Sequence, residues 1–327
     1  DIYVFKKKYD DAIKIFDDII KLNPKLSLIY NNKGYCLLNK MSFEEAIINF
    51  KKAIQHNQNY PEAYNNCGLA LNKIGKKVEA LEYFSKAIQI KNDYVQAYNN
   101  LTIIYLELNS INDALKTCTK SIEIYSKNIE AYNSLGLIYK RKNEIEKSLD
   151  SFSKALKINS NYLPSLINIA KIYTELKDYD KADEYFNKSL KIDPNNVNAL
   201  SSFINLKLET CNWENLDKLK LNLLDLCENN NNKILQPYYS LLLSDNINFQ
   251  KAIAEKYVNK FFQIKNETFI HNNNKRIRLG YFSSDFKNHA VITLIKDVFK
   301  NHDKNKFDLF GFNLSRIYQK NLIDNVT

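Results

Sequence analysis

Hydrophobic and small residues recur along this chain with a period of 34 residues. Full units begin at Ser27, Pro61, Val95, Ile129 and Leu163, and residues 1–26 fit the end of an earlier unit, so we expect the chain to be a fragment. Within each unit the apolar positions follow the spacing of two amphipathic helices separated by a short turn. The period predicts a stack of antiparallel helical hairpins, because one such hairpin cannot bury its apolar face alone.

Small and large side chains alternate in a fixed order within the unit. The eighth and twentieth positions are small, as in Gly34, Gly68 and Gly136 or Ala46, Ala80 and Ala114. The fourth, eleventh and twenty-fourth positions are large, as in Tyr64, Leu71 and Phe84. We expect the small residues to let two helices approach and the large ones to fill the remaining space. This is the pattern of the tetratricopeptide repeat, which predicts a mainly α superhelix that binds proteins or extended peptides.

Polar side chains occupy the sixth position, which in this repeat faces the groove: Asn32, Asn66, Asn100, Ser134, Asn168 and Ser202. An Asn amide both donates and accepts hydrogen bonds, so a row of them can pair with the main chain of an extended peptide. We therefore predict a peptide-binding ladder at Asn32, Asn66, Asn100 and Asn168. The alternative is that the chain is simply rich in Asn, which also fills the neighbouring fifth position (Asn31, Asn65, Asn99, Asn133).

The period weakens after Val197, where Leu216 and Leu223 replace small residues near the single Trp213. A more apolar last unit is expected where an array docks onto another element. Polar runs at 228–233 and 270–275 mark boundaries, and 234–262 contains helical stretches broken near 244–246. Strand-like runs at 276–283 and 307–313 enclose a helical stretch at 291–300, which indicates a βαβ unit. We predict repeats over 1–230, a helical linker over 231–275, and the truncated start of an α/β lobe over 276–327.

Charge and cysteine content exclude several classes of function. The formal charge is +10, but the lysines are spread along the chain, which is typical of a solvated surface rather than a nucleic-acid site. The sequence contains no stretch of 18 apolar residues, so it predicts no membrane-spanning helix. The five cysteines show no CxxC pair and no metal-ligand spacing, so we expect free thiols, a reducing cytoplasmic location and no metal or cofactor.

The order of motifs adds a family resemblance. The repeats are followed by Cys211-Asn-Trp213, by the linker run 236–245, and by Arg-Leu-Gly-Tyr-Phe-Ser-Ser-Asp-Phe-Lys-Asn-His-Ala-Val at 278–291. Together with residues 301–312, this order resembles the O-linked N-acetylglucosamine transferase family, above all its bacterial and Spindly-type branches. The resemblance implies a two-lobed, Rossmann-like B-type glycosyltransferase that moves N-acetylglucosamine from UDP to Ser or Thr of proteins.

The same resemblance implies a role for His289, which matches the family's SDFxxH motif in the catalytic cleft. Imidazole can accept a proton near neutral pH or hold the acceptor by a hydrogen bond. Without the resemblance, a single His beside a helix start is more often structural. The chain lacks the family's second lobe, which binds most of the UDP-sugar, and it has no GxGxxG motif. We therefore expect this fragment to be inactive alone, and the alternative function is a non-catalytic scaffold.

Overall fold

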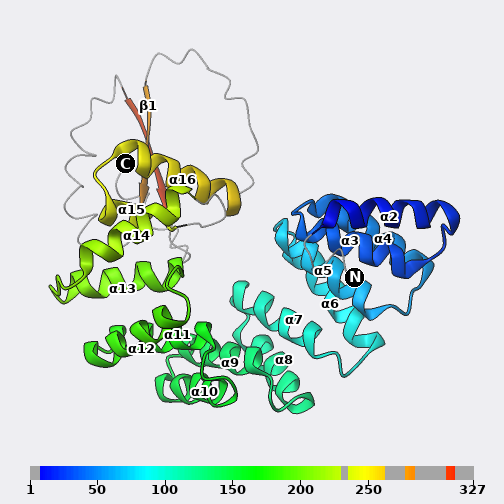
Figure 1. Cartoon of the computed structure of the whole chain (residues 1–327), viewed down its shortest axis with the longest axis horizontal. Coiled ribbons are helices and arrows are strands. Elements are labelled where there is room, and N and C mark those ends of the chain that lie inside the picture. Colours follow the sequence, from blue (N-terminus) through cyan, green and yellow to red (C-terminus); the bar gives the residue numbers. More distant parts are fainter. Residues whose placement is uncertain (1–7, 230–234, 262–276, 284–306, 314–327) are drawn as a thin grey trace. The chain divides into compact units, whose positions relative to one another are not determined.

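The chain forms two compact units, residues 1–262 and residues 263–327 (Figure 1). The computed structural model describes residues 8–229, 235–261, 277–283 and 307–313. In these ranges the first unit is entirely helical and the second contributes two strands. The predicted mainly α fold is therefore confirmed.

Six helices begin at the residues where the 34-residue units begin. They are α3 (Ser27–Asn39), α5 (Pro61–Lys73), α7 (Val95–Glu107), α9 (Ile129–Arg141), α11 (Leu163–Glu175) and α13 (Val197–Glu209). Each is followed by the second helix of its unit: α4 (Phe43–His56), α6 (Lys77–Ile90), α8 (Ile111–Ile124), α10 (Ile145–Ile158), α12 (Tyr179–Ile192) and α14 (Leu216–Asn229). The second helix of an earlier unit, α2 (Tyr9–Leu22), precedes them. Consecutive helices from α2 to α14 pack against each other, which makes the array a stack of hairpins.

The small residues allow close packing inside each hairpin. A Cβ atom placed on Gly136 would lie 2.5 Å from the Phe152 ring, and one on Gly68 would lie 2.8 Å from the Phe84 ring. Both phenylalanines are almost fully buried. The third unit instead has a larger residue, Thr102, at the eighth position, and Cys118 replaces the phenylalanine across the hairpin. The size of the eighth residue therefore matches the space that the twenty-fourth leaves.

The hairpin turns place a residue in the left-handed backbone region without relying on glycine. The fifteenth position of every unit has a φ between 53° and 79°: Met41, Gly75, Asn109, Asn143, Lys177 and Cys211. Only one of these is glycine, although this region favours it. In each unit the next backbone N–H bonds the carbonyl of the eleventh residue, as Ser42 does with Leu37 at 3.0 Å. This bond closes the first helix, and it explains how a chain with only 6 Gly builds so many turns.

The last repeat packs onto the helices that follow it. Leu216 and Leu223 are buried in a cluster that also contains Phe249 and Ile253. These two residues belong to α16 (Ile247–Phe261), which follows the short helix α15 (Pro237–Leu243). Large apolar residues therefore replace the usual small ones where α14 meets new partners, as the sequence predicted.

The second unit contains two parallel strands, β1 (Ile277–Ser283) and β2 (Phe307–Asn313). Ile277 lies opposite Phe307, and Ser283 lies opposite Asn313. Parallel pairing of strands that follow each other in the chain requires a crossover connection. The helix predicted for this crossover, at 291–300, lies outside the described residues.

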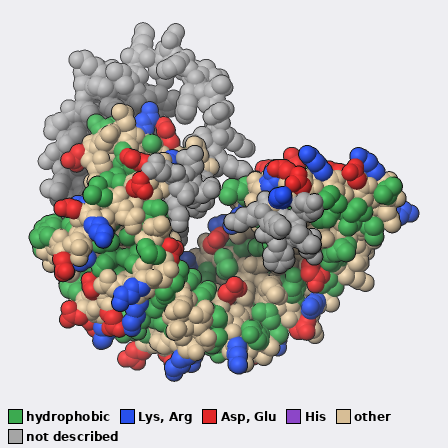
Figure 2. Space-filling model, in the orientation of Figure 1, with side chains coloured by type: hydrophobic (Ala, Val, Ile, Leu, Met, Phe, Trp, Pro, Cys, Tyr) green, Lys and Arg blue, Asp and Glu red, His purple; other side chains and the backbone are tan. Residues whose placement is uncertain are grey.

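Acidic and basic side chains are interspersed over the visible face of the described residues (Figure 2). Many of them form ion pairs between exposed groups, such as Lys154 with Asp150 at 2.7 Å. No helix in the described ranges is long and apolar enough to cross a membrane.

Candidate functional site

The four predicted ladder residues lie on the first helices of their hairpins. Asn32, Asn66, Asn100 and Asn168 belong to α3, α5, α7 and α11, respectively, and all four side chains are half-buried. Each sits near the middle of its helix, where the backbone N–H and C=O groups already bond within the helix. At these positions the side-chain amides are therefore the polar groups that remain free to bond a neighbouring helix or a ligand.

Three of these amides bond to the preceding repeat. Asn66 Nδ2 donates to Asn31 Oδ1 at 3.0 Å, and Asn100 Nδ2 donates to Asn65 Oδ1 at 2.8 Å. Asn168 Nδ2 donates to Asn133 Oδ1 at 3.1 Å. We call each such pair an asparagine rung. A rung joins the sixth position of one unit to the fifth position of the unit before it.

The rungs give the fifth-position asparagines a role that the sequence did not reveal. Asn31 is 7% exposed and Asn65 is 5% exposed, so these amides are core groups that need partners. From the sequence alone they indicate only that the chain is rich in Asn. The available signal was the recurrence of an Asn–Asn pair in successive units, which places the two amides 35 residues apart across a repeat boundary.

The ladder is interrupted at the fourth unit. The sixth residue there is Ser134, which is buried, and Asn99 turns to other partners. Asn99 Nδ2 donates to Glu130 Oε2 at 2.9 Å, while its Oδ1 accepts from Ser121 Oγ at 2.7 Å and from Asn128 Nδ2 at 3.0 Å. Asn128 also caps α9 by accepting from the backbone N–H of Ala131 at 3.1 Å. This polar cluster fixes the start of α9 in place of a rung.

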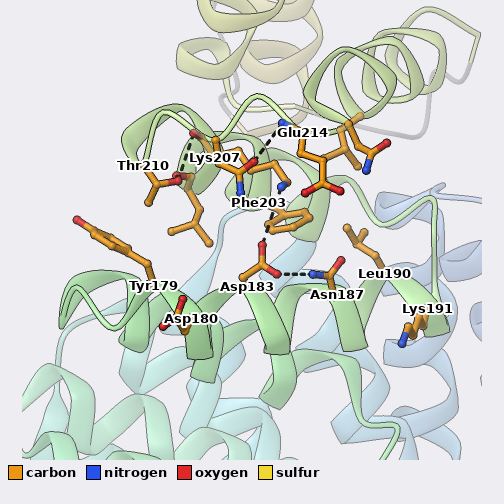
Figure 3. A pocket seen from close by; sticks show the side chains of 14 residues that line it. Tyr179, Asp180, Asp183, Asn187, Leu190, Lys191, Phe203, Lys207, Thr210 and Glu214 are labelled. Carbon is orange, nitrogen blue, oxygen red and sulfur yellow. Dashed lines mark hydrogen bonds and ion pairs between the residues drawn. The ribbon is translucent and has the colours of Figure 1, made fainter.

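A separate hollow of about 800 Å³ lies between α12, α13 and the turn that leads into α14 (Figure 3). Its wall includes Asp183, Phe203, Lys207 and Glu214. Lys207 is only 7% exposed; its Nζ lies 4.0 Å from Asp183 Oδ1 and 5.0 Å from the centre of the Phe203 ring. Asn187 Nδ2 donates to the other oxygen of Asp183 at 2.6 Å. Asp183 thus has partners on both of its carboxylate oxygens within this hollow.

The predicted catalytic residue, His289, lies outside the described residues. Strand β1 ends at Ser283, within the motif that contains this histidine. In the part of the chain that the structure describes, no group of three or more His, Cys, Asp or Glu side chains could hold a metal ion. The thiols of Cys67 and Cys118 are buried, and burial raises the pKa of each to about 12. Such thiols stay protonated at neutral pH and are poor nucleophiles.

Comparison with known proteins places these parts in two classes. Three models of the tetratricopeptide repeat match this chain. The first matches residues 1–26 and 163–196, the second matches residues 61–94 and 129–162, and the third matches residues 42–75. Residues 210–326 match the model of glycosyl transferase family 41. The chain therefore combines segments that match tetratricopeptide repeats with a segment that matches glycosyl transferase family 41.

Solved structures share the helical fold. The chain is similar to the structure of the APC/C hetero-tetramer Cut9–Hcn1, with a TM-score of 0.58 and 17% identity over 77% of this chain and 46% of that one. It is also similar to PilF of Pseudomonas aeruginosa, with a TM-score of 0.54 and 16% identity over 76% of this chain and 99% of that one. A tetratricopeptide protein of Thermus thermophilus has a TM-score of 0.50 and 19% identity over 56% and 99% of the two chains. At these identities the likeness establishes the fold alone.

Proposed function

We propose that the repeats bind an extended polypeptide by its main chain and present it to a protein O-glycosyltransferase. The transferase would move N-acetylglucosamine from its UDP donor to a Ser or Thr hydroxyl of that polypeptide. The match of residues 210–326 to glycosyl transferase family 41 supports the chemistry. The asparagine rungs support the binding, and they are the observation that carries the proposal.

A rung fixes the direction of the outer amide. Because Asn100 Nδ2 is bonded to Asn65 Oδ1, the Asn100 amide cannot rotate without losing that bond. It keeps a second N–H and its Oδ1, and within the described ranges no side chain donates to that oxygen. One remaining donor and one acceptor match the C=O and N–H of a peptide backbone. A row of such amides requires little of the side chains of the polypeptide, which suits an enzyme that modifies many proteins.

His289 completes the proposed chemistry. In the transfer, the acceptor oxygen forms a bond to the anomeric carbon while the bond from that carbon to the UDP oxygen breaks, so that UDP leaves. The hydroxyl proton must be taken up as the new bond forms, and an imidazole is suited to accept it or to position the hydroxyl. We propose that His289 lies at this point and that a second lobe, absent from these 327 residues, supplies most of the UDP contacts.

The binding part of the proposal is tested by removing two rung amides together. Peptides that bind the chain are first selected from a random peptide library displayed on phage. We expect Asn66→Ala combined with Asn100→Ala to weaken their binding by roughly tenfold or more, since each amide can lose one or two hydrogen bonds of about 1 kcal/mol each. Fluorescence polarisation measures the affinity, and circular dichroism confirms that the array remains folded.

A matched control removes two exposed asparagines from the turns between units, Asn59 and Asn92, neither of which contributes a side chain to a rung. Unchanged affinity in the rung variant, or an equal loss in the control, would contradict binding by the ladder. The catalytic part is tested with radiolabelled UDP-N-acetylglucosamine. The protein extended through the second lobe should label protein acceptors, and its His289→Ala variant should not. Labelling by the chain of 327 residues alone would contradict the division of roles between the lobes.

A further inference from the structure

The ninth position of the repeats forms a second row beside the rungs. It carries Tyr35, Leu69, Ile103 and Leu137 on α3, α5, α7 and α9, and then Lys171 on α11. Residues three positions apart on a helix share one face, so this row lies next to the sixth-position amides, one turn further along each helix. Tyr35 and Ile103 are each 44% exposed, although both are large and apolar. The face that carries the rungs is thus polar along one line and apolar along the next.

Lys171 ends this apolar row with a charge that is poorly compensated. Its side chain is half-buried, and burial lowers its pKa, with a further lowering from the nearby Lys140 ammonium. Glu175 acts in the opposite direction, but its carboxylate is already bonded to Lys140, whose Nζ lies 2.6 Å from Glu175 Oε1. Among the described residues, no carboxylate lies within 4.0 Å of Lys171 Nζ.

Lys171 shares its one nearby acidic residue with a second lysine. Lys140 lies in the last turn of α9, and its ammonium is paired with Glu175, the only carboxylate that raises the pKa of Lys171. A half-buried ammonium with a cation beside it is stabilised by an arriving anion more than an exposed lysine would be, since water screens it less. The site is therefore complementary to a carboxylate.

We propose that this face selects extended segments that carry apolar side chains over Tyr35, Leu69, Ile103 and Leu137 and an acidic side chain that reaches Lys171. The inference rests on the proposed peptide binding by the rungs and adds a side-chain preference to it. The rungs hold the main chain of any segment, whereas the ninth-position row distinguishes one segment from another. Acceptor segments would therefore share an acidic residue at one end of an apolar stretch.

The experiment compares selections from the same random peptide phage library by three forms of the whole chain. These are the wild type, Lys171→Met, and Lys157→Met as a control that removes an exposed lysine from α10. We expect Asp and Glu to be enriched at one position among peptides selected by the wild type and by Lys157→Met. That enrichment should disappear with Lys171→Met, while apolar enrichment remains.

Affinities then test the contact directly. The most enriched peptide and its Glu→Gln form are titrated against the wild type and Lys171→Met. The wild type should lose roughly tenfold in affinity on the peptide change, and the variant should lose almost nothing, as expected for one contact between charged groups. An equal loss in both proteins, or selected peptides without acidic enrichment, would overturn this inference while leaving the rungs intact. Selection of no peptides by the wild type would overturn both proposals.

A measurement without ligand separates binding from folding. Since burial and Lys140 disfavour the Lys171 charge in the free protein, Lys171→Met should raise the melting temperature of the free chain, and Lys157→Met should leave it unchanged. A lower melting temperature for Lys171→Met would contradict the view that this lysine lacks a partner. Higher stability combined with lost acidic selectivity would support a lysine that is placed for a ligand.

Discussion

A double-mutant cycle on one asparagine rung tests whether the rungs hold the repeats together. The two residues are Asn65 on α5 and Asn100 on α7, replaced by alanine singly and together. Asn65 is 5% exposed, and its Oδ1 accepts from Asn100 Nδ2 at 2.8 Å. Removing Asn100 leaves that buried oxygen without its partner, whereas removing Asn65 leaves a half-buried amide that water can reach. The two single changes should therefore have unequal costs.

The expected magnitudes follow from this difference. Asn100→Ala should lower the free energy of unfolding by about 1–3 kcal/mol, the cost of an unsatisfied buried acceptor. Asn65→Ala should cost less, about 1 kcal/mol, because water can reach the half-buried Asn100 amide that is left. Alanine favours the helix over asparagine by a few tenths of a kcal/mol, but that gain occurs at both sites and cancels in the cycle. The coupling between the two residues should be about 0.5–1.5 kcal/mol.

Urea unfolding followed by circular dichroism measures the overall stability, and native-state hydrogen exchange reports on α5 and α7 separately. The second measurement is needed because a repeat array can unfold in parts. A second rung provides an internal control. Asn133 accepts from Asn168 and also from Ser165 Oγ, each at 3.1 Å, so Asn168→Ala should cost less than Asn100→Ala. Additive effects at Asn65 and Asn100, or equal costs at Asn100 and Asn168, would refute the reasoning.

Three further predictions concern the core and its titration. Gly136→Ala should lower the free energy of unfolding by about 1–3 kcal/mol in urea titrations, because its Cβ would lie 2.5 Å from the Phe152 ring; a gain would contradict this packing. In the native chain at pH 8, the exposed Cys211 should react with a thiol reagent much faster than the buried Cys118. Burial raises the pKa of the Cys118 thiol to about 12, so that equal reaction rates would contradict its buried position. Burial also raises the pKa of Tyr94 to about 12, so the folded state keeps a proton that the unfolded state loses above pH 10. The free energy of unfolding should thus fall between about pH 10 and 12, and Tyr94→Phe should reduce that slope by about 1.4 kcal/mol per pH unit.

The boundaries of the repeats could be predicted because they depend on residues within one 34-residue unit. A small residue at the eighth position and a large one at the twenty-fourth require the same hairpin in every unit, so each first helix begins where the unit begins. The exchange of Gly for Thr102 and of Phe for Cys118 follows the same packing rule. The turn residues could not be predicted in this way. Met41 and Lys177 adopt left-handed backbone angles because the flanking helices require them, against the preference of these residue types.

The polar contacts of the candidate site were harder to predict than the fold. The sequence shows that Asn66 and Asn100 recur, but not that each donates to the preceding repeat. That bond depends on the distance between neighbouring first helices, which no local pattern encodes. The environment of Lys171 is set in the same way, by Lys140 from another repeat. The sequence therefore predicted which residues are polar, and the structure was needed to show which of them already have partners.

The rungs also connect the stacking of repeats with the proposed binding. The bond that orients the Asn66 amide is the bond that ties α5 to α3, so a ligand held by that amide would contact a group whose direction the array has already fixed. Binding to a preorganised group costs less conformational entropy than binding to a free side chain. Between α7 and α9, Asn99 instead belongs to a buried cluster with Asn128, the N-cap residue of α9, and Ser134 occupies the sixth position of that helix. A polypeptide on this face would thus meet oriented amides on α5 and α7, a unit without one on α9, and a further oriented amide at Asn168, three residues before Lys171. A polypeptide bound as proposed would therefore meet Lys171 at the end of the ladder that is nearest in sequence to the segment matching glycosyl transferase family 41.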